Sequence, residues 1–249
     1  ICKNSGCKSI GQDYCRRWYN DRRAIDKISI ETAVNNVLMK YKIFVNNPWQ
    51  ENTVVLYDET GEAVVVDCGC FSGEEEQRLK DFFLKEKLTP VLLLNTHLHP
   101  DHVFGNNFMK DCYGLEAKAS QNDEFLLEQA VEYAAILGLR GTTPPPALGG
   151  YIKDGDLLCF GHSELKVIAV AGHSPGGLCY YSEADKLLIA GDVLFAGSVG
   201  RSDLPGGNGN ALISGIREKL MVLPEDVQVI TGHGPMTTIG EEKKYNPFL

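Results

Sequence analysis

Five of the six histidines of this 249-residue chain lie in three short motifs, each following an apolar run. The motifs are residues 96–102 (THLHPDH), 172–176 (GHSPG) and 232–235 (GHGP). Asp192 follows the apolar run 187–190 and stands between the last two motifs. Imidazole is the commonest protein ligand for metals, and carboxylate completes many such sites. A chain that places nearly all its imidazoles beside glycine and aspartate is therefore predicted to bind metal.

The first motif is too dense to serve a single ion. It places four potential ligands within six residues, directly after the apolar run 91–94: His97, His99, Asp101 and His102. If that run is a buried strand, these ligands lie on the turn at its C-terminal end, the usual site-bearing edge of layered α/β proteins. Four neighbouring ligands would strain one tetrahedral ion but can serve two ions about 3.5–4 Å apart. Asp192 is the candidate for a carboxylate that bridges the two ions.

His162 provides an internal comparison, because residues 161–163 repeat the Gly-His-Ser sequence of residues 172–174. No Pro-Gly follows His162, and its flanking residues suggest the tip of a β-hairpin. We therefore predict that His162 is an exposed turn residue and that His173 is a ligand. One buried histidine alone is more often a core residue, so the prediction depends on the whole set of motifs.

The combined motifs resemble the metallo-β-lactamase superfamily. The resemblance runs from about Met39 to the C-terminus, and the sequence after Asp192 is similar to the single-domain glyoxalase II-like (hydroxyacylglutathione hydrolase-like) branch. The segments that carry this narrower resemblance are 191–195 (GDVLF), 197–203 (GSVGRSD), 232–235 (GHGP), 238–241 (TIGE) and 246–249 (NPFL).

The resemblance implies an α/β (α+β) fold, the αββα four-layer sandwich, in which two sheets pack face to face with helices outside. It also implies two divalent metal ions, with zinc as the preferred identity and iron or manganese as alternatives. The implied ligands are His97, His99 and His173 for one ion, Asp101, His102 and His233 for the other, and Asp192 as the bridge. Asp67 would orient a metal-bound histidine from behind, although a turn-forming aspartate explains that position equally well.

The implied activity is that of a binuclear metal-dependent hydrolase, which cleaves a small-molecule thioester of the hydroxyacylglutathione type with a metal-bound hydroxide. Asp101 is the candidate catalytic residue, because it could orient the nucleophile and pass a proton to the leaving group. The sequence around His173 contains no nucleophile elbow. Since Leu249 follows soon after the last motif, we expect the helical extension that grips glutathione in two-domain enzymes to be missing or rebuilt.

Other activities fit the same motifs. A persulfide dioxygenase with one iron ion would make the protein an oxidoreductase, and a lactonase or β-lactamase is compatible but fits the 197–203 loop less well. A metal-binding scaffold without turnover is a further alternative, which the complete ligand set disfavours. The loops 144–146 and 197–203 are expected to form the mouth of the pocket. Arg201 and Asp203 would shape that mouth or form a structural ion pair.

Apolar periodicity predicts strands first, a helix in each half, and strands again. The helix near 122–138 is expected to turn six residues inward: Phe125, Leu126, Ala130, Tyr133, Ala134 and Leu137. The predicted strands are 43–46, 53–57, 63–67, 91–95, 157–160, 165–170, 178–182, 186–190 and 227–231, and the predicted helices are 73–86, 103–110, 122–138 and 210–221.

Composition divides the chain in two. Residues 1–38 contain seven Lys or Arg against four Asp or Glu, whereas the whole chain has a net charge of −9. We interpret 1–38 as a non-family leader, either sequence upstream of an initiator at Met39 or a short partner-binding arm, and favour the first. Residues 39–249 are predicted to form one catalytic domain.

The acidic balance argues against nucleic acid or an anionic membrane as a partner. No apolar stretch approaches the roughly 20 residues that span a bilayer, and no signal-peptide pattern opens the chain. The five cysteines after Met39 do not pair evenly and mostly lie in apolar runs, which is typical of reduced core residues. These features predict a cytoplasmic protein.

Overall fold

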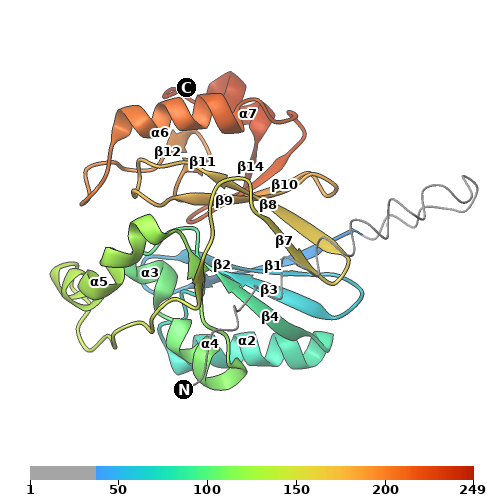
Figure 1. Cartoon of the computed structure of the whole chain (residues 1–249), viewed down its shortest axis with the longest axis vertical. Helices are drawn as coiled ribbons and strands as arrows, with labels where there is room; N and C mark the ends of the chain where they lie inside the picture. The colour runs from blue at the N-terminus through green and yellow to red at the C-terminus, as the bar shows by residue number, and fades with distance from the viewer. Residues whose placement is uncertain (1–37) are drawn as a thin grey trace, which may run out of the picture.

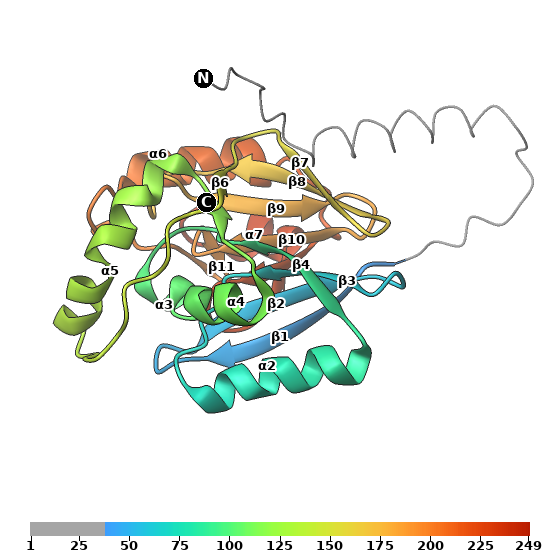
Figure 2. The same cartoon turned by 60° about the horizontal axis from the view of Figure 1, so that its bottom comes forward.

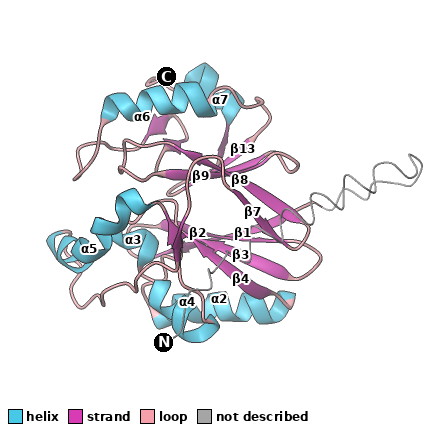
Figure 3. Ribbon diagram, in the orientation of Figure 1, coloured by secondary structure: helices cyan, strands magenta, loops and turns pink. Residues whose placement is uncertain are grey.

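The computed structural model describes residues 38–249 and contains two six-stranded sheets that face each other, with helices on both outer sides (Figure 1). The predicted αββα sandwich is confirmed, and Figure 3 shows its four layers. The predicted leader, residues 1–38, lies outside the described residues except for Leu38. No helix within the described range is long and apolar enough to cross a membrane.

The first sheet has the strand order β1-β2-β3-β4-β5-β6. Strands β1 to β3 form an antiparallel meander, and β3 to β6 pair in parallel. Parallel pairing brings the carboxyl ends of β3 and β4 side by side, so the residues that follow them meet at one edge. The strands are β1 Lys40–Asn46, β2 Glu51–Tyr57, β3 Glu62–Val66, β4 Thr89–Leu94, β5 Lys118–Ala119 and β6 Gly150–Tyr151.

The second sheet has the order β14-β13-β10-β9-β8-β7. Its central pair β10 and β13 is parallel, and β8 runs in the same direction as β10 because both are antiparallel to β9. The loops after β8, β10 and β13 therefore leave the same edge. The strands are β7 Leu157–Phe160, β8 Ser163–Ala169, β9 Leu178–Ser182, β10 Leu187–Gly191, β13 Gln228–Thr231 and β14 Thr237–Thr238, with a separate ribbon of β11 Leu194–Phe195 and β12 Ser198–Val199.

Helices cover the outer faces of both sheets. Helix α2 runs along the first sheet (Figure 2), and its N-terminus is closed by a capping box between Ser72 and Glu75. The helices are α2 Gly73–Glu86, α3 Pro100–Val103, α4 Asn106–Tyr113, α5 Glu124–Ile136, α6 Gly209–Gly215 and α7 Ile239–Tyr245, with a 3-10 turn η1 Gln121–Asp123 and a π-helical turn η2 Ile216–Leu220.

Strand alternation separates three apolar cores. In β2, Val54 and Leu56 face the second sheet, whereas Val55 faces the helices α2 and α4. On the far side, residues of β8, β10 and β13 pack against α6, η2 and α7. Both faces of the central strands β2, β3, β9 and β10 are covered, so nearly all of their residues are buried.

Several expectations from sequence are wrong in detail. The helix expected at 103–110 is two helices, α3 and α4, with Gly105 between them. In α5, Phe125 and Leu137 are exposed, so their inward assignment is wrong, whereas Leu126, Ala130 and Ala134 are buried. The helix expected at 210–221 is α6 followed by the π-helical turn. Helix α7 was not predicted.

The cysteine prediction is confirmed only in part. Cys68, Cys70 and Cys179 are free and buried. Cys112 is free but exposed, because it lies on the solvent-facing side of the short helix α4. Cys159, on β7, is only half-buried, so the expectation of a core residue is wrong there.

Candidate metal centre

All seven residues predicted from the sequence as metal ligands lie at one end of the sandwich. The first motif follows β4 in the first sheet, and the other three segments follow β8, β10 and β13 in the second. The side chains are mostly buried, and the most exposed of them is that of His233 (25%). The sheet topology therefore brings together residues that are up to 136 positions apart in the sequence.

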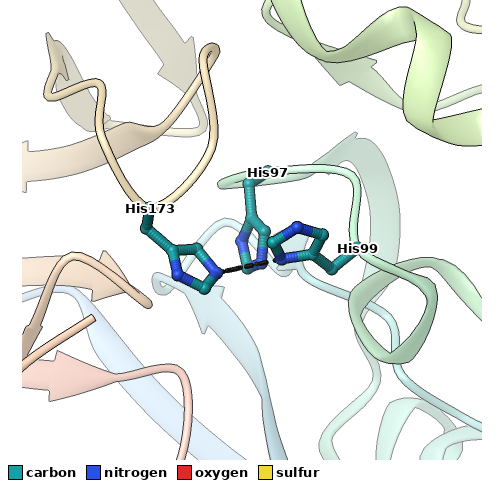
Figure 4. Close-up of side chains that lie close together, drawn as sticks. All are labelled: His97, His99 and His173. Carbon is teal, nitrogen blue, oxygen red and sulfur yellow. Dashed lines mark hydrogen bonds between the residues drawn. The ribbon is translucent and has the colours of Figure 1, made fainter. Parts of the chain in front are cut away.

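Three imidazoles converge as a first triad, His97, His99 and His173 (Figure 4). The Nε2 atom of His173 lies 2.9 Å from Nδ1 of His99 and 3.3 Å from Nε2 of His97. The rings of His99 and His173 are perpendicular, with centroids 4.6 Å apart. Two histidines come from the first sheet and one from the second, so the triad spans both halves of the molecule.

A second triad combines two imidazoles with a carboxylate: Asp101, His102 and His233. The Oδ2 atom of Asp101 lies 3.1 Å from Nε2 of His233 and 3.7 Å from Nε2 of His102. His102 is fully buried, and its Nδ1 atom lies 3.0 Å from Asp67 Oδ2. The contact of Asp67 with His102 is the one that the resemblance implied for this position.

Asp192 lies between the two triads. Its Oδ2 atom is 3.5 Å from Nε2 of His173 in the first triad and 3.7 Å from Nε2 of His233 in the second. Its Oδ1 atom is 3.5 Å from Nε2 of His102. Gly232 allows this approach, because a Cβ atom there would overlap Asp192 Oδ1. One carboxylate therefore faces ligand atoms of both triads.

The hydrogen bonds around the first triad leave its nitrogen lone pairs directed at one another. Nδ1 of His173 lies 2.8 Å from the carbonyl oxygen of Arg201, which can only accept a hydrogen bond, so the proton belongs on Nδ1. Nδ1 of His97 lies 3.1 Å from Thr96 Oγ1, whose own proton is donated to Asp67. The Nε2 atoms of both rings are then acceptors, 3.3 Å apart. Facing acceptors in a buried site repel unless a cation lies between them.

The second triad also contains buried polar atoms that lack a hydrogen-bond partner within residues 38–249. Among the described residues, His102 Nε2 and Asp192 Oδ1 are buried without a hydrogen-bond partner, although they lie 3.5 Å apart. His233 Nδ1 is 2.9 Å from the carbonyl oxygen of Trp49, so Nδ1 carries a proton and Nε2 faces the Asp101 carboxylate. Buried polar groups are normally satisfied. Nitrogen and carboxylate oxygen atoms in this arrangement suit a first-row divalent metal.

Comparison with known protein families identifies the superfamily of the chain. The model of the metallo-beta-lactamase superfamily matches residues 46–233, three quarters of the chain. The chain belongs to this superfamily. The superfamily binds divalent metals, and the chain is a metal-dependent hydrolase of this class.

Two related proteins align with most of this chain. Hydroxyacylglutathione hydrolase GloC of Haemophilus influenzae is 36% identical over 221 residues, which is 85% of this chain and 98% of GloC. Probable metallo-hydrolase YqgX of Bacillus subtilis is 34% identical over 212 residues, again 85% of this chain and 98% of the relative.

Solved structures agree with the fold. BLEG-1 B3 metallo-beta-lactamase superposes with a TM-score of 0.78 at 34% identity, covering 84% of this chain and 99% of BLEG-1. TTHA1623, solved in a di-iron-bound form, gives a TM-score of 0.75 at 34% identity and covers 84% of this chain and 100% of TTHA1623.

The electrostatics of the two triads differ in this superfamily member. Burial and the neighbouring imidazoles lower the pKa of His97 well below its usual value, and burial together with His173 lowers the pKa of His99 to about 3. Burial also acts to lower the pKa of His102, but the carboxylates of Asp101, Asp67 and Asp192 outweigh it and raise that pKa. Without metal, His97 and His99 are therefore neutral near pH 7, whereas His102 holds a proton among carboxylates.

Two supporting groups were not predicted from the sequence. The carbonyl oxygens of Arg201 and Trp49 orient His173 and His233, and a main-chain contact leaves no residue-type signal. A third, Asp123, precedes an apolar helix and has the sequence appearance of an N-cap, yet its side chain makes no cap hydrogen bond. Its side chain instead accepts hydrogen bonds from Ser174 and Gly176, in the loop that carries His173.

The surface beside the first triad is hollowed between α3 and α5. One hollow is lined by His99, Pro100, Leu126, Gln129, Tyr133 and Pro205, and a second by Pro100, Val103, Phe104, Ala130, Thr142, Thr143 and Pro145. Of the two loops predicted to form the mouth, 144–146 contributes Pro145 to the second hollow, and 197–203 contributes no lining residue to either hollow. Arg201 and Asp203 form an exposed ion pair with distances of 2.8 and 2.7 Å. The sequence left two roles open for Arg201 and Asp203, shaping the mouth or forming a structural ion pair. The structure contains the ion pair.

His162 lies where the sequence predicted. It occupies the two-residue turn between β7 and β8, with Phe160 paired to Ser163. Its side chain is half exposed and pairs with Glu59 at 2.7 Å, far from the convergent imidazoles in the fold. The two Gly-His-Ser copies therefore have different environments, and only His173 joins a triad.

Proposed function

We propose that the protein is a binuclear hydrolase that cleaves small-molecule thioesters of the hydroxyacylglutathione type. The observation that carries the binuclear part is Asp192, which faces ligand atoms of both triads. The similarity to GloC supports the thioester part. Zinc is the proposed resident metal, with iron as the alternative that the di-iron form of TTHA1623 favours.

His97, His99 and His173 would hold the first ion, Asp101, His102 and His233 the second, and Asp192 both. When bound, such ions supply hydroxide near neutral pH and polarise the substrate carbonyl. Asp101 is the proposed proton carrier, because its carboxylate is only partly exposed (13%) and belongs to the second triad. Burial acts to raise the pKa of Asp101, but His102 and His233 outweigh it and lower that pKa, so the group is ionised at neutral pH.

The lining of the mouth suggests the part of the substrate that it recognises. Within residues 38–249, neither hollow is lined by Lys or Arg. Arg201 is exposed and already paired with Asp203. Such a mouth accommodates apolar or neutral acyl groups and offers few cationic anchors to the carboxylates of glutathione. We therefore propose turnover of several small acyl thioesters, with a weaker preference for glutathione than enzymes with a dedicated glutathione clamp show.

The test combines elemental analysis with two activity assays on the purified chain. Two metal ions per chain together with release of free thiol from S-lactoylglutathione would support the proposal. One iron ion with oxygen uptake on a persulfide substrate would instead support the dioxygenase alternative. Comparison with a thioester whose carrier lacks the glutamyl arm tests the mouth. A steep preference for the full glutathione carrier would contradict the open-mouth argument while leaving the metal chemistry intact.

A further inference from the structure

Asp123 is a fully buried carboxylate with no part in the proposed hydrolysis. It ends the turn η1, directly before α5. Its Oδ2 atom accepts a hydrogen bond of 2.7 Å from Ser174 Oγ, and its Oδ1 atom accepts one of 2.5 Å from the backbone N–H of Gly176. The backbone N–H of Leu98 is a third donor to this carboxylate.

These three donors belong to the two loops that carry the first triad. Leu98 lies between His97 and His99, and Ser174 directly follows His173. Each first-triad histidine is therefore the sequence neighbour of a residue that donates a hydrogen bond to Asp123. The carboxylate joins a loop of the first sheet to a loop of the second, behind the three imidazoles.

The packing around Asp123 also explains the Pro-Gly that follows His173. A Cβ atom at position 176 would lie 2.7 Å from Asp123 Cγ and 2.8 Å from Oδ1. Glycine at this position is therefore needed for the backbone N–H to reach the carboxylate. The other Gly-His-Ser copy, at His162, has no such glycine.

We infer that Asp123 is the positioning residue of the first metal triad, which it holds in binding geometry through Leu98, Ser174 and Gly176. This inference rests on the proposed metal centre. Outer partners that orient ligands typically contribute 10- to 100-fold to metal affinity. Asparagine at this position would offer one acceptor oxygen where the carboxylate offers two, and the two backbone donors cannot reverse their role.

The test is titration of the chelator-treated full chain with cobalt(II), followed by its visible absorption, which reports the coordination of each bound ion. For Asp123→Asn we expect one of two ions to bind about 10- to 100-fold more weakly than in the wild type. Ser174→Ala, which removes one donor with little change in volume, should weaken the same ion by a smaller factor.

Asp58→Asn is the matched control. Asp58 is also a buried carboxylate, and it accepts hydrogen bonds from two backbone N–H groups, those of Thr60 and His162, and two hydroxyl groups. It joins hairpin tips away from the triads, so its variant should lose stability but bind cobalt like the wild type.

The outcomes separate the inference from the proposed function. Wild-type protein that fails to bind two cobalt ions would contradict the metal centre itself. Wild-type protein that binds two ions, with Asp123→Asn binding both equally tightly, would overturn the role of Asp123. Equal weakening in Asp58→Asn would also overturn it, because general loss of stability would then explain both variants.

Discussion

Two histidines at the centre are held through Nδ1 by backbone carbonyl oxygens, which only accept hydrogen bonds. The partners are the carbonyl of Arg201 for His173 and that of Trp49 for His233. Each contact orients the ring before any metal arrives, and the Asp67 carboxylate lies 3.0 Å from Nδ1 of His102. Asp67 adopts a left-handed backbone conformation (φ 53°), which is unfavourable for most residues other than glycine. The strain is tolerated because the side chain of Asp67 also accepts two hydrogen bonds from Thr96.

At this scale the two Gly-His-Ser copies provide a matched pair of variants. His173→Ala should lose metal and activity by more than the roughly 10- to 100-fold that loss of an outer partner costs. His162→Ala should retain both, since it removes only an exposed ion pair with Glu59. Elemental analysis and thioester turnover of the two variants check the prediction, and similar losses in both would contradict it.

At the scale of elements, strands with both faces buried determine the fold, and these were predictable. Continuous apolar runs marked β2, β3, β9 and β10 because each sheet is covered on both sides. The two-residue strands, such as β5, leave no periodic signal and exist only through pairing with a neighbour. Helix α7 was missed because it buries only Ile239 and Glu242, too few for an apolar stripe.

The candidate site was predictable where its side chains lie in recognisable motifs. The seven ligand candidates came from the histidine and aspartate motifs and the family resemblance they carry, and the structure brings them together. The groups that hold them were not predictable, because Arg201 and Trp49 act through carbonyl oxygens, which every residue carries. Asp123 was not singled out because acidic residues are common directly before a helix, and Asp123 directly precedes α5.

Helix α2 offers a test of which contacts stabilise the elements. Leu79 is 1% exposed and packs in the core beneath the first sheet, whereas Leu84 on the same helix is 77% exposed. Leu79→Ala should lower the free energy of unfolding by about 2–5 kcal/mol, and Leu84→Ala by no more than about 0.5 kcal/mol. Urea unfolding measures both. Thioester turnover at low temperature should be unchanged in either variant, because neither side chain belongs to a triad.

For the molecule as a whole, each triad takes ligands from both sheets, so bound metal would cross-link the two halves. Metal that binds only the folded state stabilises it by about 2.7 kcal/mol per site at a concentration 100 times the Kd. For a domain of this size, removing one such ion should lower Tm by roughly 5–11 °C. Calorimetry with and without chelator checks this, and an unchanged Tm would contradict a metal held between the sheets.

We also propose that residues 39–249 are sufficient for folding and activity. Every described strand and every ligand candidate lies after Met39, and the backbone N–H of Met39 already bonds to Asp185 at 2.8 Å. A chain that starts at Met39 should match the full chain in Tm and in kcat/KM. An insoluble or inactive truncation, beside an active full chain, would show that the preceding residues are required.

The division of each triad between two sheets also sets the order of events in folding. His97 follows a strand of the first sheet and His173 a strand of the second, so the two meet when the sheets dock. Interactions that form after the transition state slow unfolding and leave the folding rate almost unchanged. Stopped-flow measurements should therefore find the same refolding rate with metal or chelator, but slower unfolding with metal. Metal capture would then be the last step of folding, and the lifetime of the bound ion would be tied to the opening of the sandwich.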